Sequence, residues 1–305
     1  MSETYLVGVD MGTNLIKAGV VDSRGNVLSK ASEESRIIKP GPGRVEQDFD
    51  EIYSTAVDCI SEAVEKGGVD AGKVAGIACS SQMSGIGAID KDWNPVMPFD
   101  SWLDTRCEPY ITKMNEVAGD EITRKSGCPP TYSHGPKILW WKNERPKIYD
   151  EIYKFVVPYA YVAGKMAGLS GDEAYIEPTT VHFSNFSDTK NGEWSDDLLS
   201  KFDVDPEKMP RIIDSETIIG ELTKEAAEET GLEEGTPISA GAGDQPANAL
   251  GAGIVEPGRA FDVSGTASVF SICVDEFEPD IENKVVMSTR SIIDDSYYAL
   301  AFING

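Results

Sequence analysis

The sequence predicts an α/β fold in which a mixed sheet is built in two similar halves that face each other across a cleft. Three observations lead to this prediction. Short apolar strands open the chain one after another, a helix and a further buried strand follow them, and a hairpin near residue 265 repeats the pattern of the first hairpin. The order strand, strand, strand, helix, strand differs from the alternation of a Rossmann half, so we expect the sheet to open with an antiparallel meander.

The first part of the chain carries the clearest periodicity. Apolar runs bounded by Gly, Asn, Asp and Ser predict strands at residues 5–9, 15–21, from 26 onward, at 74–80 and at 85–90. A helix is expected from about Asp50, because apolar residues recur at helical spacing between residues 52 and 64. The glycine pair at 67–68 is expected to end it.

The rest of the chain divides into a helix-rich middle and a second set of strands. Residues 106–213 combine helical patterns with many aromatic side chains, and we expect them to cover the first sheet and line the cleft. Within this region, residues 180–188 are expected to be extended. After Pro257-Gly258, a second meander is predicted over residues 259–274, 285–293 and 297–303.

Two turns of similar sequence lie between apolar strands, one at Val9–Asn14 and the other at Val263–Ser268. Each contains a Gly-Thr pair, Gly12-Thr13 in the first and Gly265-Thr266 in the second. A duplicated hairpin of this kind indicates two similar domains.

The first turn suits phosphate binding. Glycine leaves backbone N–H groups open to a phosphate, and the Thr13 hydroxyl supplies another donor. Asp10, at the end of the first strand, is expected to hold hydrated Mg²⁺ beside the phosphates, because hard cations prefer a carboxylate and waters. The alternative is a plain hairpin turn, in which these residue types are common.

A second candidate is the run Thr236–Asn248, where an apolar strand enters glycines, then Asp244, then a helix-like stretch with Pro246 in its first turn. Phosphoryl transfer needs positioning, charge neutralisation and a base for the proton of the acceptor hydroxyl. Asp244 suits the role of that base. The alternative is that Asp244 only caps the helix.

A third candidate lies on loops that follow buried strands. Gln82-Met83 comes after the strand at 74–80, and Trp102, Asp104 and Arg106 stand within five residues of each other further on. Carboxylate and guanidinium groups bind hydroxyls, while an indole stacks on C–H faces, so the cluster resembles a polyol pocket. The alternative is a buried Trp beside a surface Asp–Arg ion pair.

These motifs together resemble the FGGY carbohydrate kinases, and they occur in order over nearly the whole chain. The matching residues are Gly8, Asp10, Gly12, Thr13 and Lys17, then Glu46-Gln47-Asp48, then Trp102, Asp104 and Arg106, then Gly243-Asp244-Gln245, and finally Ser264-Gly265-Thr266.

The resemblance implies an actin-like, ribonuclease H-like fold with flanking helices and two domains, of which the second is incomplete. The sugar-binding domain is expected over residues 1–240 and the start of the nucleotide-binding domain over 241–305. ATP and Mg²⁺ are the implied cofactors, and Asp244 is the implied general base, with Asp10 at the metal. Phosphate-binding residues are then Gly12, Thr13, Asn14, Lys17, Gly265 and Thr266. Sugar-facing or supporting residues are Gln82, Met83, Trp102, Asp104, Arg106, Tyr132 and Gln245.

Two departures from the family pattern bear on the substrate. Glycerol kinases follow this glutamine with Arg-Glu, whereas Met83-Ser84 stands here, which argues against glycerol. Xylulokinases often have His at the position of Ser84, so the case for xylulose as the substrate is weakened, although xylulose is not excluded. A ketose, a polyol or an aldonate all fit, with a xylulokinase-like activity as the leading interpretation.

The ending of the chain also departs from the family, whose members are longer. The last residues, from Tyr298 to Gly305, form an apolar strand, which as a natural terminus would expose a sheet edge. We therefore expect a truncated chain that keeps much of the sugar site and binds nucleotide poorly.

Two other functions stay open at this point. An actin-like ATPase that drives assembly or chaperoning would keep the phosphate hairpins, and a non-catalytic sugar-binding fragment would result from the truncation. The net charge of −25 argues against nucleic acid or an anionic membrane as partner. A small-molecule sugar is the expected partner, and the sequence leaves a homodimer open. Scattered cysteines and the lack of a long apolar run predict a cytoplasmic protein.

Overall fold

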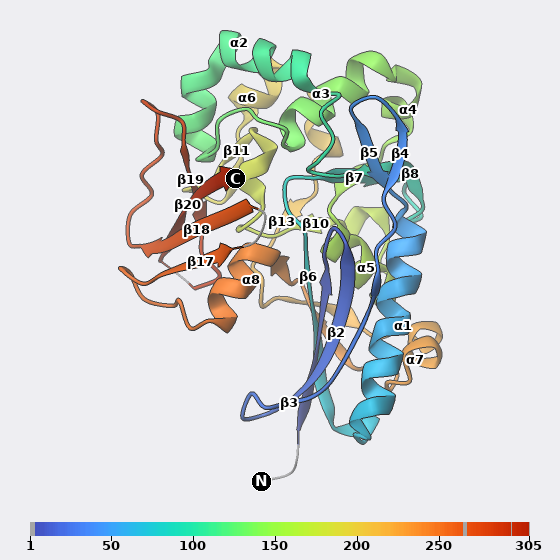
Figure 1. The fold of residues 1–305 in the computed structure, drawn as a ribbon. Helices are drawn as coiled ribbons and strands as arrows, with labels where there is room; N and C mark the ends of the chain where they lie inside the picture. Colours follow the sequence, from blue (N-terminus) through green and yellow to red (C-terminus); the bar gives the residue numbers. More distant parts are fainter. Residues whose placement is uncertain (1–3, 265–266, 294, 305) are drawn as a thin grey trace.

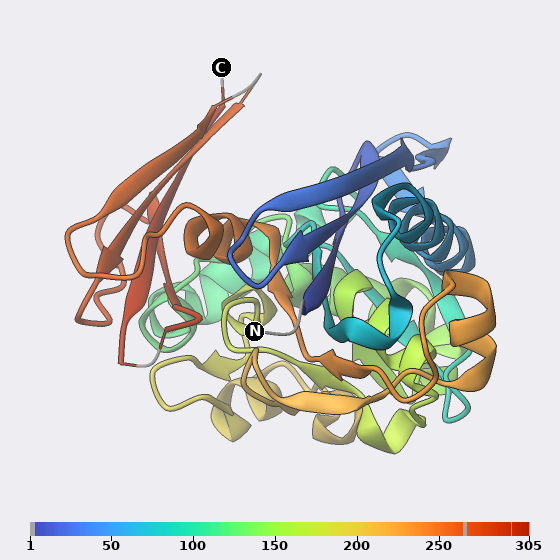
Figure 2. The same ribbon diagram turned by 90° about the horizontal axis from the view of Figure 1, so that it is seen from below.

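The computed structural model describes residues 4–264, 267–293 and 295–304 (Figure 1). A large lobe contains the N-terminal strands and most helices, and a four-stranded sheet near the C-terminus stands beside it. Figure 2 shows this smaller sheet as a separate layer, with helix α8 (Asp244–Gly251) between it and the large lobe. None of the helices in the described ranges is long and apolar enough to cross a membrane.

The central sheet of the large lobe is mixed, as predicted. Its strands run in the order β14-β15-β6-β1-β2-β3, and β16 also pairs with β6. The first three strands form an antiparallel meander, while β6 is parallel to β1, β15 and β16. The members are β1 (Tyr5–Met11), β2 (Leu15–Asp22), β3 (Val27–Glu34), β6 (Val74–Ser81), β14 (Ile218–Glu221), β15 (Pro237–Ser239) and β16 (Ala242–Gly243).

Helix α1 (Phe49–Gly67) follows the meander and confirms the predicted helix. The carboxylate of Asp48 accepts hydrogen bonds from the first backbone N–H groups, and Gly68 ends the helix in the left-handed conformation at φ 58°. Its apolar face, with Ile52 and Ile60 fully buried, packs on β2 and β3. Each such side chain contributes about 1.5–3 kcal/mol of hydrophobic stabilisation.

A second sheet of five strands, in the order β4-β5-β8-β7-β9, completes the large lobe. Its members are β4 (Ile38–Gly41), β5 (Arg44–Gln47), β7 (Ile86–Ile89), β8 (Pro95–Asp100) and β9 (Lys154–Val156). Two strand pairs are shorter: β10 (Tyr175–Ile176) with β13 (Arg211–Ile212), and β11 (Ser187–Asp188) with β12 (Glu193–Trp194). The remaining helices of this lobe are α2 (Glu108–Ser126), α3 (His134–Glu144), α4 (Pro146–Glu151), α5 (Pro158–Ala167), α6 (Asp196–Lys201) and α7 (Lys224–Thr230).

The prediction of an extended segment at 180–188 is wrong for most of its length. Residues Val181–Ser184 form a 3₁₀ turn, and only Ser187–Asp188 is a strand. The turn is closed by the hydrogen bond from Phe183 N to Thr180 O and ends at Asn185, which has a φ of 62°. Buried polar side chains in this segment bond to backbone groups instead of to a sheet. Ser184 Oγ accepts from Phe186 N, and Asn185 Nδ2 donates to the distant Cys128 O, which composition alone does not reveal.

The C-terminal sheet has the order β17-β18-β20-β19. Its strands are β17 (Ala260–Ser264), β18 (Ala267–Val274), β19 (Val286–Arg290) and β20 (Tyr297–Asn304), close to the predicted meander. Strand β20 pairs on both sides, with β18 and β19, so the expectation that the last strand is an exposed edge is wrong. A small core between this sheet and α8 contains Ala249, Ile254, Tyr298 and Leu300.

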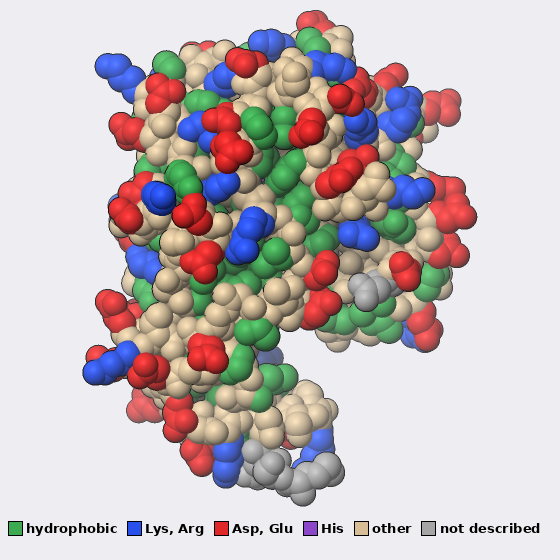
Figure 3. Space-filling view, turned by 180° about the vertical axis from the view of Figure 1, so that it is seen from behind, with side chains coloured by type: hydrophobic (Ala, Val, Ile, Leu, Met, Phe, Trp, Pro, Cys, Tyr) green, Lys and Arg blue, Asp and Glu red, His purple; other side chains and the backbone are tan. Residues whose placement is uncertain are grey.

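The surface is acidic, in keeping with the net charge. Figure 3 shows acidic side chains spread over the face opposite that of Figure 1, with basic side chains interspersed among them. Binding to the phosphate backbone of a nucleic acid would require a large basic patch, and Figure 3 shows none on this face.

The parallel pairing of β6 brings the ends of three strands to one edge of the central sheet. Met11 of β1 and Gly243 of β16 both lie opposite Ser81 of β6. Parallel strands end at the same edge, so the residues that follow them meet there. This edge is the candidate site.

Gly241, just before β16, tests how tightly this edge is built. Its φ is 82°, and a Cβ there would lie 2.1 Å from the carbonyl oxygen of Cys79. We predict that Gly241→Ala lowers the free energy of unfolding by at least about 3 kcal/mol, from left-handed backbone strain plus displacement of β6. Urea unfolding measures it.

Gly25→Ala is the matched control for this prediction. Gly25 also has a φ of 82°, but a Cβ there would meet nothing within 4 Å. It should cost only about 1–2 kcal/mol, the backbone strain alone. Equal losses in the two variants would contradict the close packing at Gly241.

Candidate active site

The structure brings the two aspartates of the sequence prediction together. Asp10 lies near the end of β1, where Ser80 Oγ donates to its Oδ1 at 3.1 Å and Lys17 Nζ lies 3.9 Å from its Oδ2. Asp244 is the first residue of α8, whose N-cap is Gly243, and its Oδ1 accepts from Gln245 N at 2.7 Å. The alternative interpretation, in which Asp244 caps the helix, is off by one residue, because the N-cap is Gly243.

The two carboxylates influence each other. Burial, with the nearby charge of Asp10, raises the pKa of Asp244 to about 7. Burial also raises the pKa of Asp10, although the Ser80 hydrogen bond and the Lys17 charge act in the opposite direction. Two carboxylates in this position favour a shared cation or a retained proton.

The donor set fits Mg²⁺ that arrives with a phosphate ligand. In the described residues, no group of three or more His, Cys, Asp or Glu side chains is placed to bind a metal ion. Magnesium usually keeps several waters and takes one or two carboxylates plus phosphate oxygens. Asp10 and Asp244 match that requirement.

A chain of hydrogen bonds crosses the same edge. Trp102 Nε1 donates to Thr13 Oγ1 at 2.8 Å, and Thr13 Oγ1 donates to Gln82 Oε1 at 3.1 Å. Gln82 Nε2 in turn donates to Gln47 Oε1 at 2.7 Å. These bonds fix the predicted phosphate-binding hydroxyl and the predicted sugar-binding indole relative to each other.

Gly12 is required by the turn that holds Thr13. Its N–H donates to Leu15 O at 3.0 Å, and a Cβ at Gly12 would lie 2.8 Å from that same oxygen. The neighbouring residues Asn14 and Lys17 lie on the same hairpin, with the side chain of Lys17 56% exposed. Gly265 and Thr266, the predicted second phosphate turn, lie outside the described residues.

Apolar and aromatic surface adjoins these polar groups. Trp102 and Tyr132 are each 37% exposed, whereas Met83 is buried against Gly243. Ser84, at a φ of 68°, donates to Tyr132 O at 3.4 Å, which ties the two loops together. The combination of an exposed indole, an exposed phenol ring and amide groups suits a polyhydroxylated ligand.

Phe302 is a further aromatic side chain that no sequence motif indicated. It lies near the end of β20, is 44% exposed, and its ring centroid lies 6.3 Å from that of Trp102 in an edge arrangement. The C-terminal sheet thus contacts the predicted sugar loop directly. Only the tertiary fold reveals this contact, because the two residues are far apart in the chain.

Gln245 follows Asp244 on α8 and carries an unsatisfied group. Its Oε1 is buried and lacks a hydrogen-bond partner among the described residues. A buried unpartnered acceptor costs about 1–3 kcal/mol, so a hydroxyl donor from a ligand would offset that cost.

Asp104 and Arg106 are placed differently from the alternative interpretation, in which they form a surface ion pair. Arg106 makes paired hydrogen bonds to Asp104 and further ion pairs to Glu46 at 2.6 Å and Asp100 at 3.0 Å. All four side chains are almost fully buried, while Trp102 is exposed. The ion pair is therefore internal and the indole is at the surface, the reverse of the alternative reading. Direct contact of either charged group with a sugar stays a prediction.

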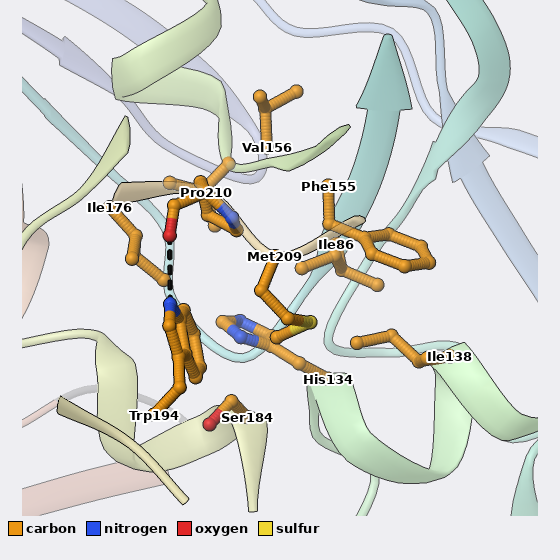
Figure 4. Close-up of a pocket in the computed structure, with 11 residues that line it drawn as sticks. Ile86, His134, Ile138, Phe155, Val156, Ile176, Ser184, Trp194, Met209 and Pro210 are labelled. Atoms are coloured by element: carbon orange, nitrogen blue, oxygen red, sulfur yellow. Dashed lines mark hydrogen bonds between the residues drawn. The ribbon is translucent and has the colours of Figure 1, made fainter. Parts of the chain in front are cut away.

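A small cavity in the large lobe is separate from this site. Figure 4 shows it between His134, Trp194 and Met209, with Trp194 Nε1 donating to Pro210 O at 2.8 Å. Its volume is about 10 Å³, which is room for about one water molecule. None of the predicted site residues lines it, and it is too small for a sugar.

Comparison with known proteins decides the family. The model of the FGGY family of carbohydrate kinases, N-terminal domain, matches residues 5–251. The chain belongs to the FGGY family. Individual relatives agree with this assignment. Over 283 residues the chain is 29% identical to a xylulose kinase from Bacillus subtilis, covering 92% of this chain and 56% of that protein. Over 269 residues it is 27% identical to an autoinducer-2 kinase from an Enterobacter species, covering 86% and 50%.

Solved structures of FGGY kinases have the same fold. A xylulose kinase from Rhodospirillum rubrum matches with a TM-score of 0.90 at 22% identity, covering 98% of this chain and 60% of that one. A gluconate kinase from Lactobacillus acidophilus matches with a TM-score of 0.89 at 22% identity, covering 98% and 59%. The predicted actin-like ATPase fold is confirmed. This FGGY chain spans about half to three fifths of the length of these relatives, so its second domain is incomplete relative to theirs.

The buried network around Arg106 gives a stability prediction. Arg106→Met leaves Asp100 and Asp104 buried without their cation and leaves Glu46 paired with Arg44 alone, so we expect a loss of about 3–5 kcal/mol in the free energy of unfolding. Arg36→Met, which removes an exposed ion pair with Glu51, should cost less than about 1 kcal/mol. Urea unfolding of both variants measures this; similar losses would show that the Arg106 network is not desolvated.

Asp244 gives a prediction with a pH dependence. Its pKa is raised to about 7 in the folded state, so the unfolded chain loses this proton at lower pH than the folded protein does. The free energy of unfolding therefore falls as the pH rises from about 4 to about 7, and this contribution is fully lost above pH 7. Asp244→Asn should therefore stabilise the protein by about 1–3 kcal/mol at pH 8, a figure reduced because the group keeps some contact with water. This stabilisation should shrink as the pH falls below 7 and should vanish near pH 4.

The control is Asp58→Asn on the exposed face of α1, which should show no such trend. Thermal unfolding from pH 4 to 8 measures both variants. A gain that persists at pH 4, or no gain at pH 8, would refute a raised pKa at Asp244.

Proposed function

We propose that the protein is an ATP-dependent kinase that transfers the γ-phosphoryl group of ATP to a sugar hydroxyl, with Asp244 as general base. The observation that supports this most is the position of Asp244. It stands at the start of α8, beside Asp10 and at the same sheet edge as the Thr13–Gln82–Trp102 hydrogen-bond chain. A base, a cation ligand and a polyol-binding surface are thereby gathered in one place.

In this proposal the sugar binds against Trp102, with Tyr132, Met83 and Phe302 around it and with Gln82 and Gln245 as hydrogen-bonding groups. Asp104 and Arg106 act from beneath, because their ion pairs hold the loop that presents Trp102. Phosphate oxygens are held by Gly12, Thr13, Asn14, Lys17 and, in the second turn, Gly265 and Thr266. Mg²⁺ held at Asp10 would supply charge neutralisation for the phosphates.

The proposed reaction is a direct transfer of the phosphoryl group from ATP to the sugar. Asp244 carboxylate accepts the proton of the sugar hydroxyl, the hydroxyl oxygen forms a bond to the γ-phosphorus, and the bond from that phosphorus to the bridging oxygen breaks to release ADP. A pKa of about 7 leaves much of Asp244 ionised at neutral pH and still basic enough to take the proton. Exclusion of water between the two lobes would favour the sugar over hydrolysis.

The substrate class is a ketose, polyol or aldonate, with xylulose the first candidate because xylulose kinases are among the similar proteins. Division of the chain into a sugar-binding domain over residues 1–240 and the start of a nucleotide-binding domain over 241–305 is part of the same proposal. Two alternatives are a sugar-binding fragment without catalysis and an actin-like ATPase, which would need no sugar.

The test is ATP consumption with a panel of ketoses, polyols and aldonates, together with calorimetric titration of each sugar. We expect one sugar to bind, and Asp244→Asn to lower its turnover by at least about a thousandfold, while Asp58→Asn leaves turnover unchanged. Binding of a sugar without turnover would favour the sugar-binding fragment. ATP consumption that no sugar stimulates would favour the ATPase and refute the kinase.

A further inference from the structure

Glu177 is a buried carboxylate that no sequence motif indicated. It follows β10 directly and its side chain is 0% exposed. The structure places no Lys, Arg or His within ion-pair distance of it in the described ranges. An uncompensated charge in this position is costly unless hydrogen-bond donors surround it.

Five donors do surround it. Glu177 Oε1 accepts from Thr179 Oγ1 at 2.7 Å, from Thr180 Oγ1 at 2.5 Å and from Gly243 N at 3.3 Å. Its Oε2 accepts from Thr179 N at 2.7 Å and from Ser215 Oγ at 3.1 Å. An ionised carboxylate is an acceptor at both oxygens, so it satisfies all five donors at once.

Three segments of chain meet at this carboxylate: residues 177–180, the loop at 213–217 and strand β16. The loop at 213–217 also accepts from Gly241, through Ser215 O at 3.0 Å, so β16 is held on two sides. A fourth element joins through Thr289 of β19, whose Oγ1 donates to Thr179 O at 2.9 Å. The carboxylate thus connects the large lobe, the C-terminal sheet and the strand that leads to Asp244.

Gly243 is the residue through which this arrangement reaches the active site. It is the N-cap of α8, and Asp244 is the next residue. The amide of Gly243 also donates to Thr179 Oγ1 at 3.4 Å, and Met83 packs against its Cα. The position of Gly243 is therefore set by Glu177 and Thr179 on one side and by packing on the other. Displacing its amide would move the start of α8 and the carboxyl of Asp244 with it.

We propose that Glu177 is a positioning residue: its carboxylate holds the amide of Gly243 and thereby aims Asp244 at the acceptor hydroxyl. The inference rests on the proposed role of Asp244. Glu177 touches neither sugar nor phosphate in this account. Through Thr179 and Thr289 it also ties the position of Asp244 to the C-terminal sheet.

Glutamine is an informative substitution at this position. Each oxygen of Glu177 faces a backbone N–H, Gly243 N on Oε1 and Thr179 N on Oε2. Hydroxyl donors can rotate, but these two N–H groups cannot become acceptors. Either orientation of the amide in Glu177→Gln sets an NH₂ group against a backbone N–H. Because the bond from Thr179 N is 2.7 Å long and the bond from Gly243 N is 3.3 Å long, we expect the amide oxygen to stay with Thr179 N and the NH₂ group to face Gly243 N.

The first measurement is hydrogen exchange of the Gly243 amide, which needs no ligand. We expect exchange to become at least about tenfold faster in Glu177→Gln. Glu177→Asp keeps the charge but shortens the side chain by one CH₂, and it should act in the same direction if Glu177→Gln does not fold. Thr180→Val is the matched control, since it removes one hydroxyl donor and leaves the Gly243 bond in place. Unchanged protection of Gly243 in the folded Glu177 variants would overturn the proposal.

The second measurement separates positioning from general destabilisation. Affinity for xylulose, the first candidate sugar, is compared in Glu177→Gln, Asp244→Asn and the double variant. We expect each single variant to lose about tenfold in affinity and the double variant to lose no more than Asp244→Asn alone, because Glu177 acts through Asp244. Losses that multiply in the double variant would mean that Glu177 is only structural.

The two proposals fail in different ways. Unchanged turnover in Asp244→Asn would contradict the assigned role of Asp244 as general base, whatever the Gly243 amide shows. Fast exchange at Gly243 together with that result would confirm the hydrogen bond but leave it without the proposed consequence, and so would overturn the positioning role as well.

Discussion

Strand β6 pairs in parallel with β1 on one side and with β15 and β16 on the other, and the candidate site depends on this pairing. Met11, Ser81 and Gly243 lie side by side, so Asp10, Gln82 and Asp244 emerge at one sheet edge although they come from distant parts of the chain. Backbone hydrogen bonds set this register, and a shift by one residue would turn the side chains to the opposite face. The chemistry of the site is therefore fixed first by main-chain geometry.

Buried charge is handled in two ways around this edge. Beneath Trp102, three carboxylates share one guanidinium, and Arg106 also lies over the ring of Trp140 at 4.9 Å. Beneath Asp244, a single carboxylate is satisfied by hydroxyl and amide donors with no cation. Both arrangements connect loops that carry site residues, so the charge that is costly to bury also fixes the conformation of those loops.

Asp10 and Asp244 are different, because their charges are only partly compensated. Burial raises both pKa values, and the charge of Asp10 adds to the shift at Asp244, which is unfavourable for folding at neutral pH. A site that must accept a proton and attract a cation needs such incomplete compensation. The contact between Trp102 and Phe302 is a second feature that is incompletely satisfied within the protein. Both rings stay partly exposed, one on the large lobe and the other on the C-terminal sheet.

Much of the local structure can be predicted from residue patterns alone. The opening meander, the first helix with its glycine end, the strand leading to Ser81 and the C-terminal strands all follow from periodicity and turn residues, because these signals act over a few neighbouring residues. The family and its fold followed from motifs read in order. The prediction for residues 180–188 is wrong, because their polar side chains bond to neighbouring and to distant backbone groups in a way that composition does not show.

The fold of the whole chain sets which residues share the site and what each side chain faces. It turned Trp102 outward while burying Asp104 and Arg106, and it brought Phe302 and Glu177 to groups far away in the chain. It also placed β20 inside its sheet, where the sequence suggested an edge. Burial, cross-strand pairing and contacts between lobes depend on where distant segments meet, and a single sequence holds no local signal for that.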